Sequence, residues 1–140
     1  MSAAYQDPAV ISRLLRDTST WAVVGLGNNP DRIAYQIAEL LQSKGKRIVP
    51  VHPRAEEVLG EAGYASLADI PFPVDVVDVF RRSDQAGETA DEAIGIGAKA
   101  VWFQVGVVDE DAAARVREAG LDMVMDTCPR IEYPRLESGS

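Results

Sequence analysis

Cysteine and histidine are nearly absent from the 140-residue chain, which has one of each. A single cysteine excludes an internal disulfide and any multi-cysteine zinc or iron–sulfur site. A single histidine excludes most histidine-based metal sites and any histidine cluster that acts as a pH switch. The sequence therefore predicts no metal site.

Long hydrophobic runs are also missing. No apolar stretch approaches the ~20 residues that a helix needs to span a bilayer. The first residues, MSAAYQDP, lack the charged segment followed by an apolar segment that is typical of a secretory signal. The expectation is a cytoplasmic protein that has no membrane partner.

Positive charge is scarce, because 14 Lys and Arg stand against 22 Asp and Glu, for a net charge of −8. Proteins that bind nucleic acid usually carry a basic face, so nucleic acid is not the expected partner. The length is near the usual size of one domain, and 46% of the residues are hydrophobic. We predict one domain over residues 1–140, with residues 136–140 as a flexible tail.

Short apolar stretches alternate with segments of helical periodicity. The apolar stretches are 21–25, 47–51, 74–80, 100–105 and 121–125, and the helical segments between and before them are 8–17, 31–43, 83–96 and 109–119. This alternation predicts an α/β fold: a Rossmann-like, doubly wound sheet of five mainly parallel strands, in the order 3-2-1-4-5, with helices on both faces. Pro50 lacks an N–H, which favours a strand end or irregular pairing there.

Ligands of such sheets bind beyond the carboxyl ends of the strands, where the strand order switches. The loop after the first strand, GLGNNPDR, begins like the dinucleotide fingerprint but has Pro30 in place of its third glycine. Gly25 and Gly27 allow a tight turn, and Asn28 and Asn29 precede a helix start that would present N–H groups to an anion. The alternative is an ordinary strand-to-helix turn.

The second strand is followed by His52, Pro53 and Arg54, and no carboxylate occurs before Glu56. Enzymes that use NAD place an acidic residue near this position to bind the ribose hydroxyls. A neutral or cationic group instead favours a phosphorylated ribose, as in NADP or coenzyme A (CoA). The alternative is a loop histidine bonded to the backbone, and no placed Ser or Cys supports a catalytic role for His52.

Five arginines follow the predicted carboxyl ends of strands: Arg32, Arg54, Arg81, Arg82 and Arg130. Arginine suits planar, bidentate contacts with phosphate. As a set they favour a small polyanionic ligand, although solvated surface arginine is the better interpretation of any single one, Arg32 and Arg130 in particular.

Two aspartates and the single cysteine are further candidates for a functional or structural role. Asp75 and Asp78 lie in or near the third strand, on opposite faces, so a structural role is favoured over paired-carboxylate catalysis. Asp78 must find donors or shift its pKa. Cys128 follows the fifth strand and is either a small buried hydrophobe or a reactive thiol near a ligand.

Six segments together carry a family resemblance: residues 25–32, 48–53, 60–71, 74–81, 97–104 and 124–129. In this order they resemble the small stand-alone CoA-binding domain proteins, over roughly residues 8–135. Similar domains form the N-terminal CoA-binding part of the succinyl-CoA synthetase α subunit and of ADP-forming acyl-CoA synthetases.

The resemblance implies a Rossmann-like domain whose cofactor is CoA. On that reading the 25–30 loop receives the pyrophosphate, and residues 52–54 lie near the 3′-phosphate. Val79, Phe80 and Arg81 flank the nucleotide and pantetheine, and Cys128 lies near the CoA sulfur. The chain is too short to hold a phosphohistidine domain as well, so we expect binding of CoA or acyl-CoA without catalysis. The alternatives are an NADP-dependent oxidoreductase or redox sensor, and a subunit of a split acyl-CoA synthetase.

Overall fold

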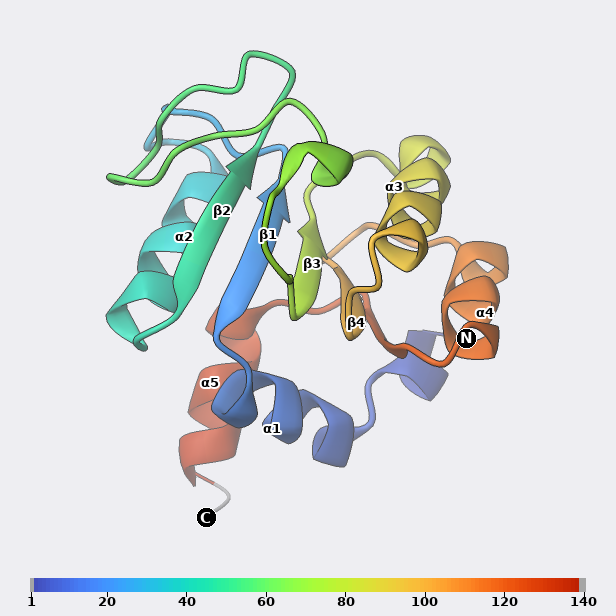
Figure 1. Cartoon of the computed structure of the whole chain (residues 1–140). Coiled ribbons are helices and arrows are strands. Elements are labelled where there is room, and N and C mark those ends of the chain that lie inside the picture. The colour runs from blue at the N-terminus through green and yellow to red at the C-terminus, as the bar shows by residue number, and fades with distance from the viewer. Residues whose placement is uncertain (1, 139–140) are drawn as a thin grey trace.

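A single five-stranded sheet organises the chain in the computed structural model, which describes residues 2–138. The strands are β1 (Thr20–Val24), β2 (Arg47–Val51), β3 (Val76–Val79), β4 (Ala100–Phe103) and β5 (Asp122–Met125). All neighbouring pairs are parallel, in the order β2-β1-β3-β4-β5 (Figure 1). The predicted α/β class is confirmed.

The predicted strand order, 3-2-1-4-5, is wrong in one respect. The third strand does not lie outside β2 but pairs with β1 on its other side. The place beside β2 is taken by the loop that follows it, since the amide of Tyr64 donates to Pro50 O and its carbonyl accepts from the His52 amide. The chain then crosses back, so the switch in strand order lies between β1 and β3.

Pro50 is a regular member of β2, opposite Val23 of β1, and the expected irregularity is absent. The carbonyl of Pro50 faces the outer loop, where it accepts from Tyr64 N at 2.9 Å. In a strand the nitrogen and carbonyl of one residue point to the same side, so the missing N–H removes no bond to β1. An edge strand tolerates proline for this reason.

Helices cover both faces of the sheet, as predicted. On one face lie α1 (Pro8–Asp17), α2 (Ile33–Ser43) and α5 (Pro129–Ser138), and on the other lie α3 (Ser83–Gly95) and α4 (Glu110–Glu118) (Figure 1). Strand residues alternate between the two cores: Trp21 and Val23 face α1 and α2, while Ala22 and Val24 face α3. Two short 3-10 turns, Ser2–Tyr5 and Leu67–Asp69, complete the described chain.

Helix α5 was not expected from the sequence, and Pro134 in its interior lacks the N–H that would continue the helix, whereas Pro129 stands at the first helical position, where proline is favoured. Tyr133 and Glu132 are nevertheless buried, and α5 packs against α1 and α2. Packing thus outweighs the lost hydrogen bond at Pro134. Residues 136–138, expected to be part of a flexible tail, form the last turn of this helix, and residues 139–140 lie outside the described chain.

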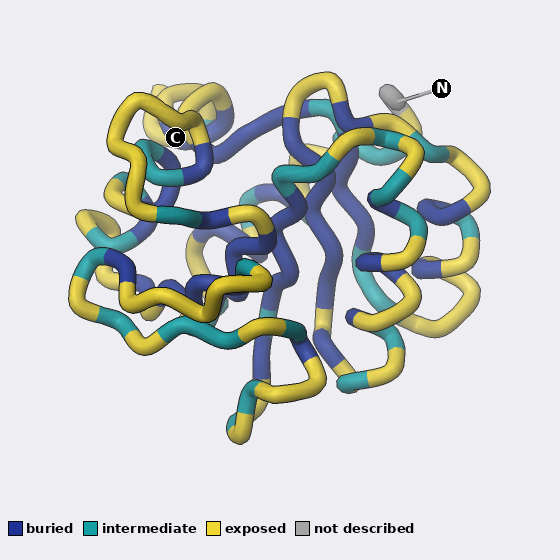
Figure 2. Tube along the Cα trace, turned by 90° about the horizontal axis from the view of Figure 1, so that it is seen from above, coloured by how far each residue is buried: buried dark blue, intermediate teal, exposed yellow. Residues whose placement is uncertain are grey.

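The buried strands lie at the centre of the molecule, and the connecting loops are exposed around them (Figure 2). Within residues 2–138, no helix combines the length and apolar character needed to cross a membrane.

Candidate functional site

A cavity of about 1370 Å³ lies at the carboxyl edge of the sheet, beside the switch point between β1 and β3. Typical small-molecule sites occupy about 300–1,000 Å³, so an extended ligand fits. The wall comes from segments far apart in the sequence: Gly25, Gly27, Asn28, Asn29, Asp31, Arg32, Ile33, Ala34, Ile37, His52, Arg54, Glu56, Phe80, Arg81, Arg82, Gln104, Val105, Val107, Cys128, Arg130 and Ile131.

The turn after β1 is fixed by Gly25, which has a φ of 99°. A Cβ atom at this position would lie 2.6 Å from the backbone oxygen of Phe80, so the end of β3 requires a glycine here. Gly27 differs, because the nearest atom to its added Cβ would be His52 Cδ2 at 4.0 Å. The fold therefore demands glycine at 25 but leaves the space beside Gly27 open toward the cavity.

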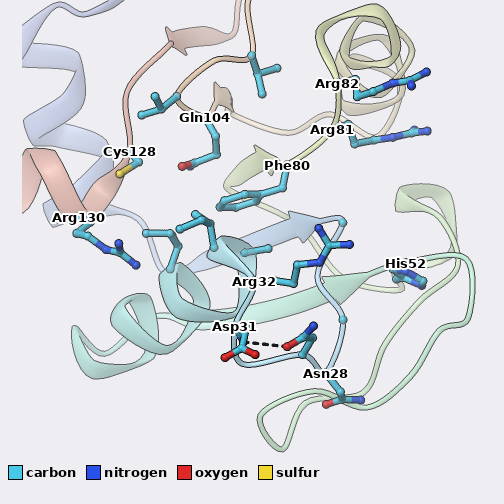
Figure 3. Close-up of a pocket in the computed structure, with 18 of the residues that line it drawn as sticks. Asn28, Asp31, Arg32, His52, Phe80, Arg81, Arg82, Gln104, Cys128 and Arg130 are labelled. Atoms are coloured by element: carbon cyan, nitrogen blue, oxygen red, sulfur yellow. Dashed lines mark hydrogen bonds between the residues drawn. The ribbon is translucent and has the colours of Figure 1, made fainter.

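The asparagines hold this loop in place. Asn28 Nδ2 donates to the carbonyl of Glu57 at 2.9 Å, and Asn29 Oδ1 accepts from the Asp31 amide at 2.9 Å (Figure 3). The carbonyl of Pro30 accepts from Gln36 Nε2 at 3.2 Å, and Pro30 itself does not line the cavity. The side chains of Asn28 and Asn29 are thus hydrogen-bonded to the protein itself, so the loop presents mainly its backbone groups to the cavity.

Two kinds of helix start occur in the described chain. Helices α1 and α4 are capped by Asp7 and Asp109, whose carboxylates accept from backbone amides of the first turn. Helices α2 and α3 begin after Arg32 and Arg82, and neither arginine side chain caps its helix. An uncapped first turn has free N–H groups and a positive dipole end, and both favour an anion.

Cationic side chains add to that field. Within residues 2–138, no ion pair within 4.0 Å involves Arg32, Arg54 or Arg81, while Arg82 pairs with Asp84 at 3.3 Å at an exposed site. Arg81 Nη1 donates to Thr89 Oγ1 at 3.3 Å. Within the described chain, Arg32, Arg54 and Arg81 thus line the cavity without a directly paired carboxylate, and the carboxylates of Asp31 and Glu56 line the same cavity.

His52 is partly bonded to the backbone, as its alternative interpretation predicted. Its Nδ1 accepts from the amide of Arg54 at 3.2 Å, which leaves Nε2 as the ring nitrogen available to a ligand. His52 and Cys128 lie on opposite sides of the cavity (Figure 3). No pairing of imidazole and thiol follows from this arrangement.

Not all of the predicted residues line the main cavity. Val79 is fully buried in the core between the sheet and α3. Pro53 lines a second cavity of about 370 Å³, which shares Gly25, His52, Phe80, Arg81 and Arg82 with the first. Phe80 therefore stands between the two spaces.

Several cavity residues were missed from the sequence, chiefly Gln104, Val105 and Val107 after β4, and Ile33 and Ile131 at the starts of α2 and α5. The rule that singled out residues after β1, β2 and β3 also covers the residues after β4. Gln104, Val105 and Val107 carry no charge, so the pattern of cations after strand ends does not point to them.

Asp78 lies fully buried below the cavity. Its Oδ1 accepts a hydrogen bond from Gln104 Nε2, and its Oδ2 has no hydrogen-bond partner. Burial raises the pKa of Asp78 to about 8, and the bond from Gln104 opposes that rise only in part. Gln104 thus links a buried acid to the wall of the cavity.

Taken together, a doubly wound parallel sheet, a glycine turn, two uncapped helix starts and unneutralised arginines at the switch point define a class. They are the features of α/β domains that bind a phosphate-bearing cofactor. The chain belongs to the CoA binding domain family, whose model matches residues 19–134.

Three relatives support this assignment. The chain is 37% identical over 125 residues to the uncharacterized protein YneT of Bacillus subtilis, covering 89% of this chain and 93% of that protein. A hypothetical protein from Pyrococcus horikoshii has a solved structure with a TM-score of 0.88 and 36% identity, covering 94% of this chain and 92% of that one. The α subunit of an ADP-forming acetate–CoA ligase II from Pyrococcus furiosus is 32% identical over 81 residues, which are 57% of this chain and 18% of that subunit.

Proposed function

We propose that this chain binds CoA or an acyl-CoA in the cavity at the carboxyl edge of its sheet, and that it performs no catalysis by itself. The observation that carries the proposal is the unneutralised positive charge of Arg32, Arg54 and Arg81 beside the uncapped starts of α2 and α3. CoA has a pyrophosphate and a 3′-phosphate, so its charge complements this edge. Membership of the CoA-binding family supports the choice of this cofactor.

Each part of the site has a task in this proposal. The first-turn amides of α2 and the backbone around Gly27 would receive the pyrophosphate. His52 Nε2 and Arg54 would contact the 3′-phosphate, and Phe80 and Arg81 would flank the nucleotide. CoA, when bound, supplies a thiol or thioester as the reactive group, and the chain's own residues orient it.

The absence of catalysis by this chain is part of the proposal. Its single histidine and its single cysteine stand on opposite sides of the cavity, so neither activates the other (Figure 3). The relative from Pyrococcus furiosus is a subunit of an acetate–CoA ligase, and this chain matches 18% of the length of that subunit. A subunit of a split acyl-CoA synthetase is therefore a second candidate, in which another chain would supply the chemistry.

Binding is tested by thermal unfolding of the protein with CoA, acetyl-CoA, NADPH or NADH. A ligand at 100 times its dissociation constant adds about 2.7 kcal/mol to the free energy of unfolding. We expect stabilisation by CoA or acetyl-CoA and none by NADH. Stabilisation by NADPH without any by CoA would overturn the proposal in favour of an NADP-dependent protein.

A further inference from the structure

Exposed apolar side chains gather at the cavity. Four large hydrophobic residues within residues 2–138 are exposed: Ile33 (50%), Val105 (57%), Val108 (38%) and Ile131 (39%). Three of these line the same cavity, although they come from the start of α2, the loop after β4 and the start of α5. Single exposed hydrophobics are ordinary on a surface, whereas convergence on one hollow indicates a contact surface.

The cavity is polar at one end and apolar at the other. His52, Arg81 and Arg82 lie on one side, and Gln104, Cys128 and Arg130 lie on the other (Figure 3). Val105 adjoins Gln104 in the chain, and Ile131 lies three residues beyond Cys128, which is a buried, free thiol. The apolar end is thus formed by Val105, Val107, Cys128 and Ile131.

The polar side chains at this end, Arg130 and Gln104, are already hydrogen-bonded within the protein. The guanidinium of Arg130 donates from Nη2 to Gln36 Oε1 at 2.6 Å, so a side chain of α2 holds it. Gln104 is 4% exposed, and its amide is bonded to the buried Asp78. A carboxylate placed beside these apolar residues would lose water, whereas an aliphatic chain would cover Val105 and Ile131.

We propose that this apolar end is a subsite for the acyl chain of a thioester, which makes the ligand an acyl-CoA with an uncharged aliphatic acyl group. The inference rests on the proposed function, since it assumes that the phosphates occupy the arginine end. CoA is elongated, with its phosphates at one end and its sulfur at the other. A molecule bound with its phosphates at the arginines extends its sulfur toward Val105 and Ile131.

The first test measures the dissociation constants of CoA, acetyl-CoA, butyryl-CoA, hexanoyl-CoA and succinyl-CoA by titration calorimetry. Full burial of a methylene corresponds to roughly fourfold tighter binding. We expect at least about fourfold tighter binding of butyryl-CoA than of acetyl-CoA for two half-buried methylenes. Hexanoyl-CoA should bind more tightly again, and succinyl-CoA no more tightly than acetyl-CoA.

Three results would contradict the inference: the first two leave the proposed function intact, and the third is the failure of the proposed function itself. If all CoA compounds bind equally, or free CoA binds most tightly, the protein binds CoA but the acyl subsite is absent. If succinyl-CoA binds most tightly, Arg130 recognises a carboxylate and the subsite is charged. If no CoA compound binds, the proposed function itself fails.

Variants locate the subsite. In the double variant Val105→Ser with Ile131→Ser, we expect the ratio of hexanoyl-CoA affinity to CoA affinity to fall toward one. The matched control is Val108→Ser, which removes another exposed valine of the same loop that lies outside the cavity wall, and it should keep the wild-type ratio. Arg54→Ala should weaken both ligands and keep the ratio. If the affinity ratio is unchanged in the double variant, or is lost in Val108→Ser, then Val105 and Ile131 do not form the acyl subsite. If the double variant does not fold, the affinities of the wild-type protein for the five CoA compounds still decide the inference.

Discussion

The two edges of the sheet treat charge differently. At the amino edge, Asp75 accepts from the amides of Ser19 and Thr20 and pairs with Lys99 at 3.3 Å. At the carboxyl edge, Arg32, Arg54 and Arg81 have no such ion pair within the described residues. Among the described residues, the charged side chains at the amino edge form ion pairs with one another. Three arginines at the carboxyl edge, where the cavity opens, form none.

The same contrast separates the helix starts. Asp7 and Asp109 cap α1 and α4, whereas arginines stand at the corresponding positions of α2 and α3. A carboxylate cap occupies the amides that an anionic ligand would otherwise bind. The first-turn amides of α2 and α3 are therefore not occupied by a side-chain cap and are open to the anionic ligand that we propose.

Removal of two arginines from the carboxyl edge should have the largest effect. The double substitution Arg54→Ala with Arg81→Ala should weaken CoA binding by about a hundredfold, because a hydrogen bond to a charged group contributes roughly 1.5 kcal/mol or more. Titration calorimetry at constant salt measures the change.

The matched control removes two positive charges from the amino edge, by Arg13→Ala with Lys99→Ala. These side chains are exposed and pair with Asp122 and Asp75. We expect CoA affinity close to that of the wild-type protein. Equal losses in the two double variants would show that net charge, and not the carboxyl edge, determines binding.

A smaller effect is expected at Asp78, which lies between the edges. Its pKa of about 8 exceeds the unfolded value of about 3.9, so the folded state keeps a proton that the unfolded state has released. The free energy of unfolding should therefore fall as pH rises from about 4 to 8, by at least about 2 kcal/mol between pH 5 and 8. Asp78→Asn cannot ionise, so this slope should disappear.

Urea unfolding at pH 5 and 8 measures this slope through the fluorescence of the fully buried Trp21 and Trp102. Asp75→Asn is the comparison. Burial tends to raise the pKa of Asp75, but the amides of Ser19 and Thr20 and the ammonium of Lys99 outweigh it and lower the pKa. The stabilisation by Asp75 is present above about pH 4 and is lost only as pH falls through its lowered pKa. Asp75→Asn should keep the wild-type slope of the free energy of unfolding between pH 5 and 8. If the slope survives in Asp78→Asn, Asp78 is not the group that causes it.

The smallest effects are expected from two glycines of one turn. Gly25→Ala should lower the free energy of unfolding by about 2 kcal/mol, because of its positive φ and its approach to Phe80. Gly27→Ala should change stability by less than about 0.5 kcal/mol, since an added methyl group has room there. CoA affinity should nevertheless fall at least tenfold, by roughly 1.4 kcal/mol, if phosphate packs on this backbone. Unchanged CoA affinity in Gly27→Ala would move the phosphate away from this turn.

Local pattern predicted the five strands and four of the five helices correctly, and the five arginines that it placed after strand ends all line one cavity. The strand order was wrong because the pattern does not show that Tyr64 occupies the edge of β2. Helix α5 was missed because burial of Tyr133 and Glu132 stabilises a helix that Pro134 in its interior disfavours. Uncharged cavity residues such as Val105 and Gln104 gave no signal before the fold placed them beside the arginines.

The sequence by itself determined that apolar strands alternate with helices and that arginines follow strand ends, since periodicity and spacing are local properties. It also determined that one cysteine and one histidine are the only thiol and imidazole groups in the sequence. Only the tertiary structure decided that the arginines lack partners, that Asp78 is isolated from water and that Ile33, Val105 and Ile131 meet at one cavity. Those properties depend on distances between residues up to about a hundred positions apart in the chain, and such distances are set by packing and strand order.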